Sequence, residues 1–230
     1  ATSRRWPFFT FEAPLWANGT KFSFVSRLKV GEDGSAMTVF CLASTRLVVQ
    51  RWTSNAFNIQ IKDTAGATIA NWFTTGATFN TAAGAFWFFL DVDMNGGAPI
   101  INVWANIGGA DVNISPGTAP AAGNGVIGLG NHPYLFNTGN GQCSFKGSVG
   151  PMWAADDVLA GGGFSLAANR RLFCSLPGAP VDLGAAGVVG GIAPELYLPG
   201  GPGDWLTGKN FGSGAQGAFN DNWLKGFGAN

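Results

Sequence analysis

The stretch Phe86-Trp87-Phe88-Phe89-Leu90-Asp91-Val92-Asp93 decides the fold, because it is apolar on both faces of an extended chain. An apolar run of this length that ends at a turn signal, here Asn95-Gly96-Gly97, is typical of a central β-strand. After the turn, residues 101–106 alternate between aliphatic side chains and Asn or Trp. This period of two predicts a neighbouring strand with one buried face.

Similar segments recur at intervals of about ten residues, separated by Gly, Asn, Asp or Pro. The expected strands are residues 21–30, 37–42, 47–52, 57–61, 67–73, 86–93, 101–106, 126–130 and 143–153. Residues 111–125 are expected to form an irregular loop. The one helical segment is Ser165 to Phe173, with Ser165 as N-cap and with Leu166, Leu172 and Phe173 facing inward. The pattern predicts an all-β protein with two antiparallel sheets.

A chain of 230 residues is within the range that β-sandwiches fill as one domain. Three parts are distinguished along it. Residues 1–20 form an aromatic N-terminal segment, residues 21–176 the sandwich, and residues 177–230 a Gly- and Pro-rich tail. We expect the tail to wrap around the same domain with little regular structure.

The composition limits the partners. Hydrophobic residues make up 46% of the chain, charged residues only 11%, and the formal net charge is zero. A neutral chain has no electrostatic attraction toward phosphate backbones or anionic lipid, so we expect neither nucleic acid nor membrane as a partner. Net charge near zero also favours self-association, which indicates a homo-oligomer.

The cysteines and the apolar runs predict no disulfide, zinc site or membrane span. Cys41, Cys143 and Cys174 lack C-x-x-C spacing, so we expect neither a disulfide framework nor a zinc site. The longest apolar run, Ala85 to Leu90, is too short to span a membrane. Residues 1–11 lack the succession of basic, apolar and small residues that a signal peptide has. Export would therefore use another route, such as release by lysis.

Two groups of motifs resemble known protein families. The aromatic strand at residues 86–93, the strand at 101–106 and Phe145-Lys146-Gly147-Ser148-Val149-Gly150-Pro151-Met152-Trp153 follow one another as in concanavalin A-like and laminin G-like modules. The later stretch from Asn169-Arg170-Arg171-Leu172-Phe173 to Pro194-Glu195-Leu196-Tyr197-Leu198 resembles an extension of such domains in tailed-phage structural proteins. The first resemblance implies a jelly-roll sandwich of the concanavalin A-like lectin and glucanase type, and the second implies a virion component.

Catalysis is not expected. Glucanases of this fold carry an E-x-D-x-x-E strand, because retaining hydrolysis needs two carboxylates about 5 Å apart. Here Glu12, Glu32 and Glu195 lie far apart in sequence, although carboxylates from separate loops could still converge. His132, the only histidine, has no nucleophile-elbow sequence nearby. Residues 123–128 match G-x-G-x-x-G but precede a predicted strand, so no nucleotide site is expected.

Two other kinds of site have residues to support them. Asp91 and Asp93 point to the same face of a strand and could bind Ca²⁺ with Asn95, or Asp93 to Gly96 could simply form a strand cap and turn. No other cofactor is indicated. A sugar ring could stack on an exposed tryptophan.

The residues proposed to bind sugar are Trp104, Trp52, Trp72, Asn102 and Asn106. For each tryptophan, burial in the core or in a subunit interface is the competing interpretation.

The N-terminal aromatic residues are too numerous to lie in water. They either form an edge strand of the sandwich or dock onto a neighbouring subunit. The candidate assembly contacts are Trp6, Phe8, Phe9, Phe11 and Trp16.

Three functions follow from these patterns. The first is a non-enzymatic phage virion protein, such as a capsid decoration, head-fibre or tail-fibre component. It would be located in the virion and contact itself and other virion proteins, and its lectin-like fold could also bind host or mucosal glycans. The alternative is a stand-alone carbohydrate-binding module. The third is a glycan hydrolase.

Overall fold

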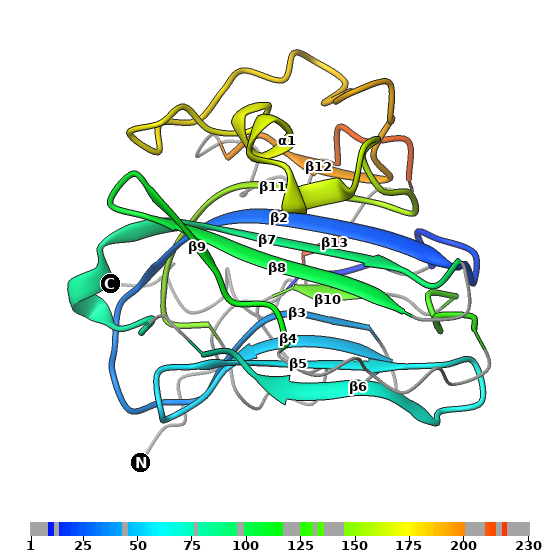
Figure 1. Cartoon of the computed structure of the whole chain (residues 1–230), viewed down its shortest axis with the longest axis horizontal. Helices are drawn as coiled ribbons and strands as arrows, with labels where there is room; N and C mark the ends of the chain where they lie inside the picture. Colours follow the sequence, from blue (N-terminus) through cyan, green and yellow to red (C-terminus); the bar gives the residue numbers. More distant parts are fainter. Residues whose placement is uncertain are drawn as a thin grey trace, which may run out of the picture.

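The computed structural model describes residues 9–11, 14–42, 46–75, 78–95, 99–116, 125–130, 133–135, 145–200, 210–214 and 218–219. Two antiparallel sheets pack face to face, and a C-terminal segment covers one of them (Figure 1). The predicted all-β class with two antiparallel sheets is confirmed.

The six-stranded sheet contains the stretch that decides the fold. Its order is β12 (Leu196–Leu198), β11 (Gly147–Ala155), β2 (Lys21–Val30), β7 (Ala85–Asp93), β8 (Ile100–Ile107) and β9 (Ala110–Asn113). Strand β7 pairs with β2 and with β8 along its whole length, so the predicted central strand is confirmed.

The seven-stranded sheet lies opposite. Its order is β13 (Ala218–Phe219), β1 (Phe9–Thr10), β10 (Pro133–Leu135), β3 (Met37–Leu42), β4 (Leu47–Arg51), β5 (Phe57–Lys62) and β6 (Thr68–Phe73). A short 3₁₀ turn, η2 (Thr81–Ala83), lies between β6 and β7.

The main core fills the space between the two sheets. From β7 it receives Phe86, Phe88, Leu90 and Val92, while β5 supplies Phe57, Ile59 and Ile61. These side chains alternate with residues on the other face of each strand, as the period of two requires. In this core Phe57 contacts Phe88 with ring centroids 4.8 Å apart.

The outward face of the six-stranded sheet carries a second core. Val25, Trp87, Phe89 and Trp153 project from β2, β7 and β11, and residues 156–200 cover them. We call residues 156–200 the extension; in Figure 1 it lies, yellow to orange, over the side of this sheet that faces away from β3 to β6. The run at residues 86–93 is apolar on both faces because each face contacts a different core.

The helix is shorter than its sequence predicts. A 3₁₀ turn, η3 (Gly163–Ser165), precedes α1 (Ala167–Arg171), whose N-cap is Leu166 rather than Ser165. Leu166 and Leu172 are exposed, and only Phe173 packs inward. One helical turn cannot direct residues 166, 172 and 173 to the same side, which corrects the inward assignment of both leucines.

Three segments near the loops also differ from expectation. Residues 110–113 form β9 inside the expected loop, and Ile127 makes only isolated bridges to Gly19 and Asp63 where a strand was expected. The tail adds short strands to both sheets: β12 pairs with β11, and β13 pairs with β1. Within the described ranges, no helix is long and apolar enough to cross a membrane.

Candidate functional site

Polar side chains form a row across the outward face of the seven-stranded sheet. Thr38 pairs with Gln50, and Gln50 with Asn58, across β3, β4 and β5. Gln50 Nε2 donates to Thr38 Oγ1 at 3.3 Å. Asn58 Nδ2 donates to Asn71 Oδ1 on β6 at 2.9 Å. We call Thr38, Gln50, Asn58 and Asn71 the amide row; Thr38, Gln50 and Asn58 are buried, and Asn71 is exposed.

Two aromatic side chains lie at the end of the amide row. Phe73 pairs with Asn58 across β5 and β6, and Trp52 follows the last residue of β4. Trp52 is 40% exposed and Phe73 49% exposed, and their ring centroids are 5.7 Å apart in an edge-to-face arrangement. This exposed aromatic pair beside the exposed amide of Asn71 is the candidate site on the seven-stranded sheet.

A tight turn fixes the position of Trp52. Trp52 N donates to the carbonyl oxygen of Ala56 at 2.8 Å, and Asn55 N donates to the carbonyl oxygen of Trp52 at 2.9 Å. Asn55 has φ of 62°, a left-handed conformation that Asn tolerates better than most residues. Phe79 N donates to the Asn55 carbonyl oxygen at 2.8 Å and ties the turn to the sandwich.

The buried guanidinium of Arg51 supports this turn from within. Its Nε donates to the Phe79 carbonyl oxygen at 2.7 Å and its Nη1 to that of Ser35 at 2.9 Å. Its Nη2 contacts the side chains of Asn55 and Asp33. Burial lowers the pKa of Arg51, and the charge of Asp33 opposes this shift. Such a buried cation persists because its donors are satisfied.

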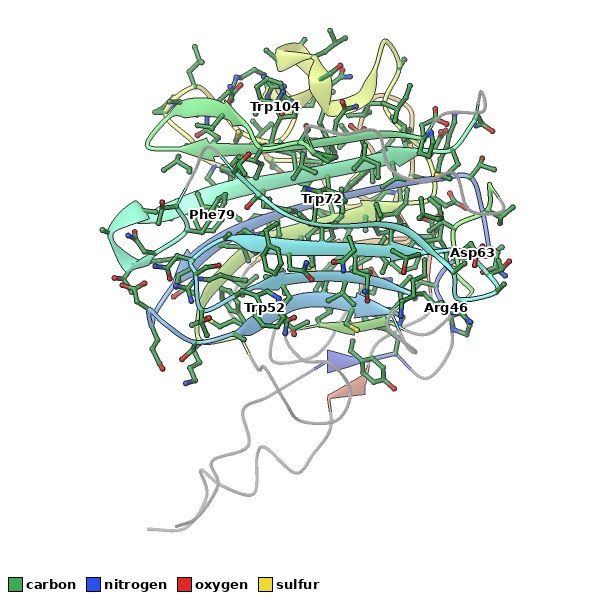
Figure 2. All side chains as sticks on the ribbon, turned by 60° about the horizontal axis from the view of Figure 1, so that its bottom comes forward. Arg46, Trp52, Asp63, Trp72, Phe79 and Trp104 are labelled. Atoms are coloured by element: carbon green, nitrogen blue, oxygen red, sulfur yellow. The ribbon has the colours of Figure 1, made fainter. Side chains whose placement is uncertain are left out.

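The structure separates the predicted sugar-binding residues into two groups. Figure 2 shows Trp104 beside the extension and Trp52 on the other sheet. Trp72 pairs with Ile59, whose side chain lies in the main core, and packs half-buried against that core. Trp72 therefore does not join Trp52 on the outward face.

Trp104 lies beneath the extension. The Arg170 guanidinium carbon is 3.9 Å from the Trp104 ring centroid. Asn106 is buried and donates to Asp111 Oδ1 at 2.7 Å, and Asp111 also accepts from Arg170 Nε at 2.9 Å and from Arg171. Burial alone would raise the pKa of Asp111, but these hydrogen bonds outweigh it and lower the pKa. Trp104 and Asn106 thus anchor the extension and do not form an open sugar platform.

Asp91 and Asn102 belong to the same buried layer. Asn102 Nδ2 donates to Asp91 Oδ1 at 2.7 Å, and the Phe164 amide donates to Asp91 Oδ2. Burial raises the pKa of Asp91 to about 6, although these hydrogen bonds act in the opposite direction. Asp91 therefore bonds the extension to β7.

The proposed calcium ligands Asp91, Asp93 and Asn95 each take part in hydrogen bonds within the chain. Asp93 Oδ1 accepts from Asn95 N at 2.8 Å, as in the strand cap and turn that the sequence offered as the alternative. Among the described residues no three His, Cys, Asp or Glu side chains lie close enough to share a metal ion.

The N-terminal segment packs on its own domain where it is described. Phe11 and Trp16 are buried in the main core, so neither side chain is available to a neighbouring subunit, which corrects their assignment as assembly contacts. Phe9 pairs through its backbone with Leu135 and Phe219. Trp6 and Phe8 lie outside the described residues.

The carboxylates expected to be dispersed have structural partners. Glu32 accepts from Lys146 Nζ at 2.8 Å, which lowers its pKa. Glu195 accepts from Trp16 Nε1 at 2.8 Å and from Asp156 N at 3.2 Å. Burial, with the nearby Asp156 charge, raises the pKa of Glu195. Glu12 and His132 lie outside the described residues.

Sequence reasoning missed most of the outward surface. It named Trp52 but not Phe73, Asn58, Asn71 or Gln50. The alternation of Asn58, Gln60 and Lys62 was a usable signal, because it marks an outward face. The pairing of that face with β4 and β6 requires the strand register, which local sequence does not provide.

Comparisons with known proteins identify the fold. No family model matches the chain, and no curated protein matches it. A native heptameric SAP-like pentraxin from Limulus polyphemus has a similar structure, with 12% identity, a TM-score of 0.50 and coverage of 70% of this chain and 74% of the other.

A second similar structure is a candidate carbohydrate-binding protein from Bacteroides ovatus. It has 11% identity and a TM-score of 0.52; the match covers 93% of this chain and spans only 56% of that protein's length. Identities this low show the fold alone. The chain has the concanavalin A-like jelly-roll fold.

Proposed function

We propose that the chain is a carbohydrate-binding module that holds its glycan on the outward face of β4, β5 and β6. The observation that carries the proposal is the exposed Trp52–Phe73 pair beside the amide row. This is the alternative that the sequence offered, at a site of which the sequence named only Trp52.

The chemistry of the surface suits a sugar ring. The apolar face of a pyranose removes aromatic surface from water when it stacks on an indole, and its hydroxyl groups need both donors and acceptors. Amide side chains supply both. Asn71 is exposed, and its Oδ1 already accepts from Asn58, which orients the Asn71 Nδ2 donors toward other partners.

The fold supports the same reading. The Bacteroides ovatus protein described as a candidate carbohydrate-binding protein shares the sandwich architecture, although this likeness extends to the fold alone.

A glycan array followed by calorimetry on its best ligand tests the proposal. Trp52→Ala and Phe73→Ala should each weaken binding about tenfold or more, because each removes a stacking ring. Ile100→Ala is the matched control, since Ile100 is also exposed but lies on the six-stranded sheet. Binding that Trp52→Ala leaves unchanged, while circular dichroism shows an intact fold, would refute the assignment of this surface.

A second role, as a subunit of a larger assembly such as a phage virion, is favoured by one observation. The exposed large apolar side chains of the extension are Leu166, Leu172, Leu176, Val181 and Val188. All but Leu166 lie in the stretch from Asn169 to Leu198 that resembles phage structural proteins, on a chain with zero net charge.

Light scattering on the full chain tests this second role. A discrete oligomer that dissociates in the double variant Leu176→Asp and Val188→Asp would support assembly through the extension. Removal of residues 1–16 is a poor test, because it deletes Phe11 and Trp16 from the core. A monomer at every concentration would exclude self-assembly.

A further inference from the structure

Strand β6 forms an open edge of the seven-stranded sheet, beside the proposed glycan surface. It is the outermost strand of this sheet, with β5 on one side only (Figure 1). Its six residues make it the longest of the strands that end a sheet, because within the described part of the chain β9 has four residues, β12 three and β13 two. An edge of this length presents a row of backbone groups with which a further strand can pair.

The register shows which backbone groups of β6 lie at the open edge. Thr74 N donates to the Phe57 carbonyl oxygen at 2.8 Å, so the backbone of Thr74 points toward β5. Successive residues of a strand point their N–H and C=O groups to opposite sides, and the backbone of Trp72 therefore also points toward β5. The backbone groups of Asn71 and Phe73 point to the open side. Within the described part of the chain, no backbone hydrogen bond engages them there.

The features that keep sheet edges unpaired are largely missing from β6. Edge strands are commonly protected by charged residues, by proline or by a covering segment. Thr68–Phe73 contains no charged residue and no proline. By contrast, Phe211 N donates to the Tyr197 carbonyl oxygen and covers β12, and β9 contains Asp111, which pairs with two arginines. The one irregularity is a bulge opposite Lys62, near the start of β6, which leaves the end of the strand regular.

We propose that β6 pairs antiparallel with β6 of a second copy of the chain, about a twofold axis at Trp72. In this register Asn71 of each copy lies opposite Phe73 of the other, and each such pair exchanges both of its N–H···O bonds. The edge is thus complementary to itself, as a twofold interface requires. A second copy is the favoured occupant because the edge carries no charge and the chain has zero net charge, so two identical edges do not repel each other.

The pairing joins the outward faces of the two copies into one surface. Asn71 and Phe73 are exposed on this face, so each copy places its Asn71 side chain beside Phe73 of the other. The consequence for glycan binding rests on the proposed function: a glycan chain would contact the aromatic pairs of both copies. The pairing itself needs no glycan, because backbone groups form it.

Sedimentation velocity without glycan, from about 5 to about 500 µM protein, tests the pairing, since an interface of one strand is expected to be weak. The mean mass should rise from that of one chain toward that of two. Asn71→Pro removes an N–H at the open edge without breaking a hydrogen bond to β5, and it should abolish this rise. Asn71→Ala keeps that N–H and should dimerise as wild type does. The double variant Leu176→Asp and Val188→Asp should also dimerise, because it alters only the extension.

Amide hydrogen exchange of the wild-type chain gives a second measurement that does not depend on a variant folding. At the higher concentration the amides of Asn71 and Phe73 should exchange at least about threefold more slowly, while that of Trp72 should be protected at both concentrations. A monomer at every concentration, or a dimer in which the Asn71 and Phe73 amides stay unprotected, would overturn the proposal. A monomer that binds glycan would leave the proposed function standing, and a dimer that binds none would leave the pairing standing.

Discussion

The buried carboxylate of Asp91 should make the stability of the protein depend on pH in a defined direction. Burial raises the pKa of Asp91 to about 6, against 3.8 for an ordinary aspartate. The native state therefore binds this proton more tightly than the unfolded chain does. As pH rises from about 4 to about 6, the native state loses this advantage, and the free energy of unfolding falls.

The magnitude follows from the size of the shift. A difference of about two pKa units corresponds to about 3 kcal/mol at 1.36 kcal/mol per unit. Asp91→Asn removes the titration and should flatten this part of the profile. The variant's absolute stability is a poorer readout, because the amide must place its NH₂ near either Asn102 or the Phe164 amide, and a mismatched buried donor costs about 1–3 kcal/mol.

Urea unfolding, followed by tryptophan fluorescence at pH values from 4 to 8, measures the profile. Subtracting the Asp91→Asn curve from the wild-type curve cancels groups such as Glu195, whose raised pKa acts in the same direction. Asp182→Asn is the control, because Asp182 is an exposed carboxylate that is not among the groups shifting the pKa of Asp91. If wild type and Asp91→Asn show the same slope between pH 4 and pH 6, the assignment of a buried, proton-binding Asp91 is wrong.

Two further predictions concern the extension and the thiols. Arg170→Met should lower the free energy of unfolding by about 3–5 kcal/mol, because it leaves Arg171 as the only cation paired with the partly buried Asp111. Arg171→Met should lower it by less, because the Arg171 guanidinium is more exposed. Equal losses of stability in the two variants would contradict this ranking. Cys41 and Cys174 are buried, and burial raises their thiol pKa values to about 12 and about 11. Peptide mapping after iodoacetamide treatment at pH 8 should therefore find neither cysteine alkylated in the native protein and both alkylated in urea.

The strand at residues 86–93 shows how far sequence reasoning reaches. Apolarity on both faces predicted a central strand, and that is what β7 is. The pattern could not show that the second face is covered by the chain's own extension. That cover comes from residues such as Phe164 and Phe173, dispersed in a Gly-rich segment without periodicity.

The candidate site was predicted only in part for the same reason. Trp52 was found because exposed tryptophan beside a strand is a local signal. Phe73 and Asn71 join it through the register of β5 with β6, in which Phe73 pairs with Asn58 and Asn71 with Gln60. This register joins residues that are distant in sequence, and residue types alone do not encode it.

The extension determines which face of the sandwich is left for ligands. It uses Trp104, Asn102, Asn106 and Asp91 as internal contacts, and a side chain that already bonds to the extension is not available to an external sugar. The outward face of β4 to β6 keeps its aromatic pair exposed in the same structure. The extension thus takes the outward face of the six-stranded sheet away from external ligands and leaves that of the seven-stranded sheet as the candidate surface.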